Sequence, residues 1–239
     1  VKDSPRKNIS SKPESKSFFE IIIILHRTLS NSKSLVLTIM AGTLYHVVLG
    51  AAQFEVIWAV ADKGFNPNYF GQINGWIFVV FGVLGSLFGG IASDWALKKY
   101  SLPRTWFLLI LTLLLMPLAF TRYLEIDSVL FWIGICSSAF SLGCFYGPIF
   151  AVIQELVPST IKGTIVAFNL LCLNLLGIAF GSIMFGIMAD YAVNQGYEDP
   201  YTSLLVGFSS IYLVLGPPLY YFAGKYYQSD KKKLNEIFD

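Results

Sequence analysis

Six long apolar stretches constrain this chain more than any other feature of its sequence. They cover residues 35–61, 68–92, 103–121, 128–156, 163–190 and 204–226, and charge, proline or glycine bounds each of them. A bilayer core about 30 Å thick needs roughly 20 apolar residues of helix to cross it. Charged residues make up only 13% of the chain, against about 25% in a soluble domain. The sequence therefore predicts an all-α membrane protein, a bundle of six transmembrane helices.

The basic residues lie mostly on one side of these six predicted helices. They precede the first helix, join the second to the third and the fourth to the fifth, and follow the sixth. Of the 17 lysines and arginines, Lys63 and Arg122 alone fall on the other side. The positive-inside rule then predicts that both ends of the chain are cytoplasmic, in a plasma membrane or a bacterial inner membrane. A miscounted helix would mix the two groups, so the bias supports an even number of spans.

The sequence divides into four segments. Residues 1–17 are rich in Ser, Lys and Pro and predict a polar cytoplasmic linker, with no signal-peptide pattern. Residues 18–33 mix apolar with charged side chains, which is typical of an amphipathic helix on the membrane surface; a linker with a collapsed apolar stretch is the alternative. The six-helix half covers 34–227, and 228–239 form a cytoplasmic tail. Because the chain starts at Val1 with a linker, we expect a further part of the protein upstream.

Small residues recur at intervals of four along the second and fifth predicted helices. The second carries Gly71 and Gly75, then Gly85 and Gly89; the fifth carries Gly177 and Gly181, then Ser182 and Gly186. No hydrophobic force draws helices together in lipid, so small residues that allow close approach do this work. We expect both helices to pack tightly, against the upstream half of the protein.

The loop after the second helix carries a recognisable pattern. Its sequence is Gly89-Gly90-Ile91-Ala92-Ser93-Asp94-Trp95-Ala96-Leu97-Lys98-Lys99. It resembles the loop signature Gly-x-x-x-Asp-Arg-x-x-x-Arg/Lys of the major facilitator superfamily of transporters, with Gly90 and Asp94 in register and Trp95 in place of the usual arginine. A carboxylate at this place can pair with the cationic loop or with a neighbouring helix end.

Further runs are similar to the spinster-like group of that superfamily. They are Tyr146-Gly147-Pro148 and Gln154-Glu155-Leu156-Val157-Pro158 in the fourth helix, and Asn174-Leu175-Leu176-Gly177 in the fifth, which closes on Gly186 to Asp190. Lys162 stands where the group usually has an arginine. The resemblance implies the C-terminal six-helix half of a twelve-helix transporter, partnered by an N-terminal half. It also implies secondary active transport of an amphipathic small molecule, such as a lysolipid or a phosphorylated sphingoid base, by alternating access with a proton as the coupling ion.

Polar side chains inside the predicted helices are the candidates for the transport pathway. Such groups are costly in a bilayer unless they face protein or water, so each is a functional hypothesis. We assign the substrate or proton pathway to Tyr45, His46, Gln53, Glu55, Asn74, Ser138, Tyr146 and Asn169.

Two titratable residues of the first helix lead this set. Glu55 is the only acid well inside a predicted helix, and a carboxyl group in a cavity of low dielectric constant can bind and release a proton. The alternative is a structural role, reaching outer water or pairing with Lys63. His46 can titrate or donate to a substrate, or it can bond to a neighbouring helix. At about 100° per residue the two lie on different helix faces, so we do not expect them to share a site.

A second polar set lies at the predicted cytoplasmic ends of the helices. It consists of Asp94, Lys98, Gln154, Glu155 and Lys162. These residues predict a network that gates the cytoplasmic side. Salt bridges at the membrane surface without a gating role are an equally good interpretation.

The sequence indicates no enzyme. It contains no nucleophile beside a base, no glycine-rich phosphate loop and no ligand cluster with metal spacing. We therefore expect no catalytic residue, no metal and no cofactor apart from the coupling proton. The expected partners are the N-terminal half, the lipid bilayer and a small amphipathic substrate, and no nucleic acid.

Two alternatives remain open. The same fold can carry another solute, such as an organic anion, a sugar or a drug. An anion needs cationic residues in the cavity, and the sequence places no lysine or arginine well inside a helix. The more distant alternative is a membrane scaffold subunit that transports nothing; it predicts polar residues paired between helices, with no water-filled cavity.

Overall fold

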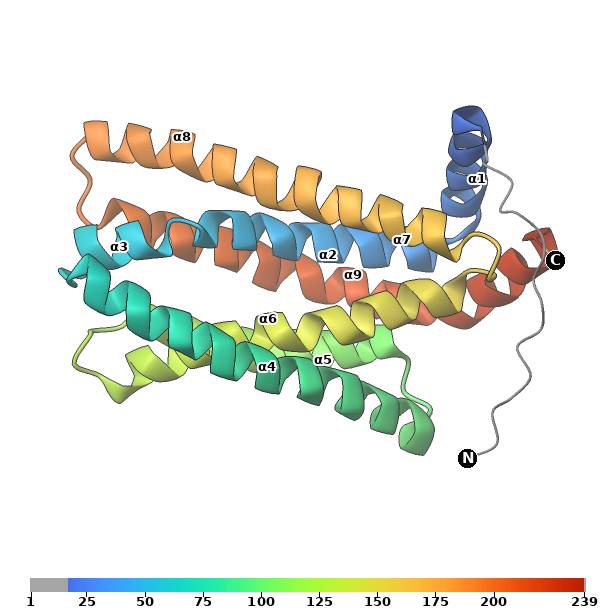
Figure 1. Cartoon of the computed structure of the whole chain (residues 1–239), viewed down its shortest axis with the longest axis horizontal. Coiled ribbons are helices and arrows are strands. Elements are labelled where there is room, and N and C mark those ends of the chain that lie inside the picture. The colour runs from blue at the N-terminus through green and yellow to red at the C-terminus, as the bar shows by residue number, and fades with distance from the viewer. Residues whose placement is uncertain (1–16, 239) are drawn as a thin grey trace.

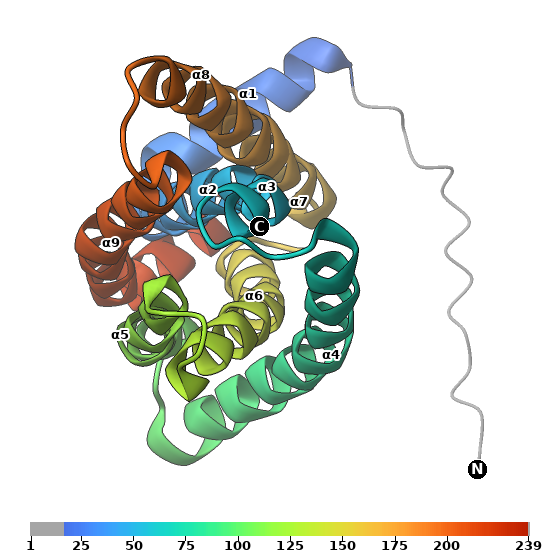
Figure 2. The same ribbon diagram turned by 90° about the vertical axis from the view of Figure 1, so that its left-hand side faces the viewer.

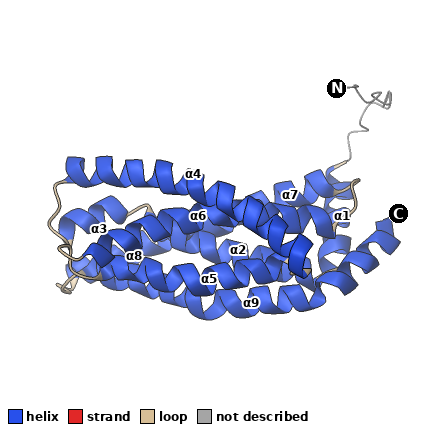
Figure 3. Cartoon of the chain, turned by 90° about the horizontal axis from the view of Figure 1, so that it is seen from below, coloured by secondary structure: helices blue, strands red, loops and turns tan. Residues whose placement is uncertain are grey.

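The computed structural model describes residues 17–238, so all of the predicted linker except Ser17 lies outside the described residues. The elements are α1 (Phe18–Asn31), α2 (Lys33–Ala52), α3 (Glu55–Ala61), α4 (Pro67–Tyr100), α5 (Arg104–Phe120), the 3₁₀ turn η1 (Thr121–Tyr123), α6 (Val129–Leu156), α7 (Lys162–Leu171), the π-helical segment η2 (Cys172–Ala179), α8 (Phe180–Asn194) and α9 (Pro200–Phe238). Within the described range no strand occurs, and loops gather at the two ends of the bundle (Figure 3).

Six helical units are long and apolar enough to cross a membrane: α2, α4, α5 with η1, α6, the continuous α7–η2–α8, and α9. They lie side by side along the long axis of the molecule, while α1 is turned across one end (Figure 1). Seen end-on, α2 and α6 lie between α5 and α9 on one side and α4 on the other (Figure 2). The predicted six-helix, all-α membrane fold is confirmed.

Polar residues mark where several of these helices begin. The side chain of Asn66 accepts hydrogen bonds from the backbone N–H groups of Asn68 and Tyr69 at the start of α4. Ser128 accepts one from Leu130 N–H at the start of α6. The first N–H groups of a helix have no partner within the helix, so a side-chain oxygen at this place satisfies them and fixes the boundary.

Three helical units differ from simple straight spans. The first is interrupted: Gln53 and Phe54 bond back to Gly50 and Ala51, three residues earlier, which ends α2 and turns the chain into α3. The fifth widens into the π-helical η2. The sixth continues as helix through the predicted tail to Phe238. There the buried carboxylate of Asp230 accepts a hydrogen bond of 2.7 Å from Ser34 N–H and ties α9 to the start of α2.

Glycines allow the closest helix contacts, and several of the predicted ones pack within this chain. On α4, Gly85 and Gly89 lie against the backbone of Phe140 and Cys144 of α6. On the fifth unit, Gly181 lies against the backbone of Val47 of α2. For these glycines the predicted partner, an upstream half, is wrong, because a methyl group at any of them would meet backbone atoms of a neighbouring helix of this chain. For Gly71 and Gly75, where an added Cβ meets no atom within 4 Å, packing against an upstream half stays a prediction.

Gly85→Leu should destabilise the bundle, whereas Gly75→Leu on the same helix should not. A Cβ at Gly85 would collide with the carbonyl oxygen of Phe140, but one at Gly75 meets no atom within 4 Å. Overpacking of this kind costs roughly 1–3 kcal/mol. Thermal unfolding of the purified chain in detergent, followed by circular dichroism, measures the difference. Equal melting temperatures for the two variants would contradict the α4–α6 contact.

Candidate functional site

An ion pair is buried near one end of the bundle. Glu55, the first residue of α3, receives a hydrogen bond of 2.7 Å at Oε1 from Nη1 of Arg122 in η1. The two residues are only 4% and 5% exposed. Ionised groups taken out of water lose several kcal/mol of solvation each, so such a pair persists only where further polar groups support it.

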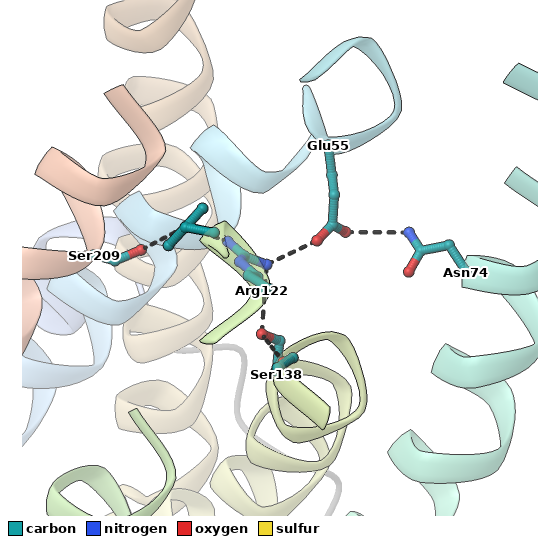
Figure 4. A network of polar contacts seen from close by, with 7 residues as sticks. Glu55, Asn74, Arg122, Ser138 and Ser209 are labelled. Carbon is teal, nitrogen blue, oxygen red and sulfur yellow. Dashed lines mark hydrogen bonds and ion pairs between the residues drawn. The ribbon is translucent and has the colours of Figure 1, made fainter. Parts of the chain in front are cut away.

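Four neighbours supply this support (Figure 4). Asn74 of α4 donates to Oε2 of Glu55 at 3.1 Å, and Arg122 Nη1 also approaches Ser138 Oγ of α6 at 3.4 Å. Arg122 Nη2 donates to the hydroxyl of Tyr123 at 2.7 Å, and that hydroxyl lies 3.3 Å from Ser209 Oγ of α9. The network therefore joins α3, α4, η1, α6 and α9.

Two local features place the charges here. The turn at Gln53–Phe54 ends α2, so Glu55 starts a new helix instead of continuing the old one. Gly134 of α6 lets η1 approach, since a Cβ there would collide with the backbone N of Arg122. Both features act on the backbone, and neither shows in the hydropathy pattern.

A cavity of about 50 Å³ lies beside the ion pair. Its polar groups come from Tyr45, Arg122, Tyr123, Ser138, Ser141 and Ser209, and Tyr45 donates to Ser141 at 3.4 Å. The other lining residues are apolar and include Leu49, Met116 and Leu142. One water needs roughly 10–15 Å³, so the cavity has room for a few polar atoms next to the guanidinium group.

His46 lies in a different place, between α6 and the π-helical segment. Its Nε2 is 3.2 Å from the hydroxyl of Tyr146, and its Nδ1 is 2.8 Å from the carbonyl of Gly42. Gly177 of η2 packs against it so closely that a Cβ there would collide with the Cβ of His46. The structure thus gives His46 a bond to a neighbouring helix, and it keeps His46 and Glu55 in separate contacts, as expected.

Comparisons with known proteins now add to this geometry. No protein-family model matches the chain, and no curated protein matches it. Solved structures do match, and two of them are of a bacterial homologue of the human lysosomal transporter Spinster. The inward-facing, occupied form aligns over 84% of this chain and 51% of its own, with a TM-score of 0.68 and 14% identity. The chain has the fold of half a major facilitator superfamily transporter.

The inward-facing, unoccupied form of that homologue agrees. It aligns over 99% of this chain and 55% of its own, with a TM-score of 0.61 and 14% identity. The chain therefore spans about half of the length of either transporter. Six apolar helices in one integral membrane unit are what such a transporter half contains.

Within this fold, the structure gives Glu55 another partner than Lys63, which the sequence had offered as one structural alternative. Lys63 does not pair with Glu55; it donates to the carbonyl of Tyr123 at 3.3 Å. No lysine or arginine was expected well inside a predicted helix, and Arg122 indeed lies at the end of the α5–η1 unit, but it is buried there. The sequence shows that Arg122 follows one apolar stretch and that Glu55 lies in another, which does not reveal that they meet.

The other pathway residues are dispersed. Gln53 is exposed at the turn between α2 and α3. Asn169 of α7 is fully buried, and neither atom of its amide group finds a hydrogen-bond partner within residues 17–238. The structure therefore brings Glu55, Asn74 and Ser138 together, pairs His46 with Tyr146, and leaves Gln53 and Asn169 outside both groups.

At the opposite end a second network forms around Arg104. Its Nη2 lies 2.7 Å from Asp94 and its Nη1 lies 3.1 Å from Glu155, whose other oxygen accepts a hydrogen bond from Tyr227 at 2.7 Å. The expected pairing of Asp94 with its cationic loop is confirmed. Lys98 and Gln154 are exposed and Lys162 is half-buried, and these three lie outside the network. Arg104 and Tyr227 were missed, because one was counted as a loop charge and the other as an ordinary aromatic residue.

Glu55→Gln should destabilise the folded bundle strongly, because the buried Arg122 guanidinium then has no counter-charge. Removal of one partner of a buried pair costs roughly 3–5 kcal/mol. The double variant Glu55→Gln/Arg122→Gln should recover part of that loss. Asp94→Asn is the matched control, since 54% of its side chain is exposed and such pairs contribute about 0–1 kcal/mol. Thermal unfolding in detergent ranks the variants by melting temperature. An equal fall in melting temperature for Glu55→Gln and Asp94→Asn would show that the buried pair stabilises the bundle no more than the exposed one.

Proposed function

We propose that this chain is the C-terminal half of a secondary active transporter that works with an N-terminal half of six helices. The substrate is an amphipathic small molecule with an anionic head, such as a lysolipid or a phosphorylated sphingoid base. Transport proceeds by alternating access and is coupled to protons. The observation that carries the proposal is the Glu55–Arg122 ion pair beside the cavity of about 50 Å³.

The ion pair gives proton and substrate a common site. A proton on Glu55 removes the counter-charge of Arg122, which leaves a buried cation unpaired. An anionic head bound to the guanidinium group removes that penalty, since planar guanidinium groups bind phosphate and carboxylate through two parallel hydrogen bonds. Each ligand therefore favours the binding of the other, by the same factor in both directions. That reciprocity is what proton-coupled uptake of an anion requires.

The surroundings suit an amphipathic molecule rather than a small polar ion. Ser138 and Ser141 supply hydroxyl groups near Arg122, while Leu49, Met116 and Leu142 supply apolar surface in the same cavity. An anionic head group would bind at the charged end, and the hydrocarbon tail would extend out of this small cavity past its apolar side. His46 and Tyr146, with Tyr45, Gln53, Asn74 and Asn169, remain the candidates for the rest of the pathway.

The network around Arg104 serves in this proposal as the cytoplasmic gate. Arg104 joins Asp94 of α4 to Glu155 of α6, and Tyr227 adds α9. Breaking these bonds would uncouple four helices, α4, α5, α6 and α9. Lys98, Gln154 and Lys162 are then candidates to complete the gate with an N-terminal half. Interfacial salt bridging without gating is the alternative, and charge-neutral variants of Arg104 that leave transport unchanged would favour it.

A second candidate function is transport of a different organic anion on the same fold. Arg122 favours it, because the guanidinium group would bind a carboxylate or sulfate as readily as a phosphate. A sugar or neutral drug gains nothing from this cation. A scaffold subunit without transport predicts that Ser138 and Ser141 are closed to water. Labelling of Ser138→Cys and Ser141→Cys by a membrane-impermeant thiol reagent would therefore count against the scaffold.

Uptake in proteoliposomes tests the coupling in the full transporter that contains this chain. Fluorescent lysophosphatidylglycerol should accumulate faster under an inward proton gradient than without one. Glu55→Gln mimics the protonated acid, so it should abolish the stimulation by protons, and Arg122→Gln should lower uptake roughly tenfold or more through loss of a charge-assisted pair worth about 1.5–3 kcal/mol. Glu125→Gln, an exposed acid close to Arg122 in sequence, should behave as wild type.

Two results would overturn this mechanism. If lysophosphatidylglycerol is taken up no faster than in empty liposomes, lysolipids are not the substrate class. Faster uptake of an anionic dye in the same proteoliposomes would then favour the second candidate. A Glu55→Gln variant whose uptake still follows the proton gradient removes Glu55 as the coupling residue.

A further inference from the structure

An apolar groove of about 740 Å³ runs along the outside of the bundle, far larger than the cavity beside the ion pair. α2 forms its floor, the π-helical segment with α7 and α8 forms one wall, and α9 forms the other; Leu29 of α1 closes one end. Of the side chains that line it, all within the described range, none is charged and Thr43 carries the only hydroxyl group. Known ligand pockets of proteins enclose roughly 300–1,000 Å³.

The groove is separate from the proposed transport site. α2 presents Val36, Met40, Thr43 and Val47 to the groove, whereas it presents Tyr45, Val48 and Ala52 to the cavity near Arg122. Side chains three and four residues apart share a helix face, so these two sets lie on different faces of α2. An occupant of the groove therefore makes no contact with the ion pair.

The length of the groove matches one leaflet of a bilayer. Between Val36 and Val47 the helix advances roughly 16 Å at about 1.5 Å per residue. Half of a hydrocarbon core about 30 Å thick is about the same distance. The groove therefore has the reach of one lipid leaflet and ends near the middle of the membrane.

Cations mark the outer end of the groove. Lys33 precedes Val36 by one helical turn on the same face of α2, and its ammonium group lies 5.2 Å from the ring centre of Tyr226, one turn beyond the groove-lining Phe222 of α9. Arg27 of α1 lies 5.3 Å from the ring centre of Phe238 at the same end of the bundle (Figure 1). Both cations are exposed, and within residues 17–238 neither forms an ion pair.

The nearby acid forms no ion pair with these cations. Asp230 is buried, and its Oδ2 accepts hydrogen bonds from Ser34 N–H and Ser32 Oγ. Among the described residues, Lys33 and Arg27 therefore have no carboxylate partner within 4 Å and can meet an anionic group at the surface of the bundle. A basic site between transmembrane helices at the surface of a leaflet is a recognised setting for anionic lipid head groups.

We propose that the groove binds an anionic phospholipid of the bilayer, with its phosphate at Lys33 and one acyl chain between α2, η2 and α9; Arg27 is a second cation farther along the same end of the bundle. The lipid is a bound structural partner and is distinct from the transported molecule. It fills the space where the fifth unit and α9 separate, and it holds α1 against the bundle through Leu29.

Photo-crosslinking in vesicles tests the proposal. The purified protein is reconstituted in phosphatidylcholine with a minor share of phosphatidylglycerol that carries a diazirine in one acyl chain, and adducts are mapped by mass spectrometry. Adducts should concentrate on the α2, η2 and α9 residues of the groove, and a phosphatidylcholine probe should label them less. Lys33→Glu should lower phosphatidylglycerol labelling of the groove roughly fivefold or more, since one basic residue contributes about 1 kcal/mol at such a surface.

Matched variants separate the groove from general lipid contact. Met40→Trp fills the groove and should lower labelling there, whereas Leu114→Trp on the exposed face of α5 should not; both parent side chains are more than half exposed, so neither change should unfold the protein. Lys98→Glu on α4 is the charge control. Equal labelling by the two lipids, no effect of Met40→Trp, or crosslinks to a second copy of the chain in place of lipid would each overturn the proposal.

Discussion

Close approach of helix backbones at glycine is the contact on which the rest of this bundle depends. In lipid the helices gain nothing by burying apolar surface against one another, so van der Waals contact over small residues has to hold them. Gly85 and Gly89 let α4 approach α6 closely. On α6, Gly143 lies against the backbone of Gly82 of α4. Gly50 and Gly181 do the same between α2 and the fifth unit, where Ser182 also donates to the carbonyl of Gly50 at 3.0 Å. These contacts set the distances between the helices that carry the polar groups.

The buried ion pair follows from that packing. Asn74 reaches Glu55 only because α4 is held close to the bundle, and Arg122 reaches it only because Gly134 admits η1. A charged pair in such a place is poor evidence of stability, since well-packed apolar residues would often do as well. In the function we propose, its value lies in having two states, paired and separated, which differ by the occupancy of a proton and an anion.

The sequence predicted much of this architecture and little of the site. Six apolar stretches of the right length predicted the six membrane-capable helices, and Gly90 with Asp94 pointed to the superfamily whose fold the chain shares. Glu55 was singled out because a lone acid in an apolar stretch is conspicuous, and it stays a candidate pathway residue. Its true partner was not singled out, since Arg122 was assigned to a loop. Arg104 and Tyr227 were missed for a similar reason: sequence distance says nothing about which helix ends meet.

Hydropathy, length and charge bias are properties that each segment carries by itself, so the sequence alone determined the membrane class, the number of helices and the fold. Pairing is a property of two segments. Glu55 and Arg122 are 67 positions apart in the sequence, and neither segment by itself shows that they pair. Three further features likewise depend on how neighbouring helices pack: the break at Gln53–Phe54, the π-helical segment Cys172–Ala179 and the groove beside α2. Tertiary structure decided these features, because the free energy that selects them comes from contacts between helices and not from the preferences of any one of them.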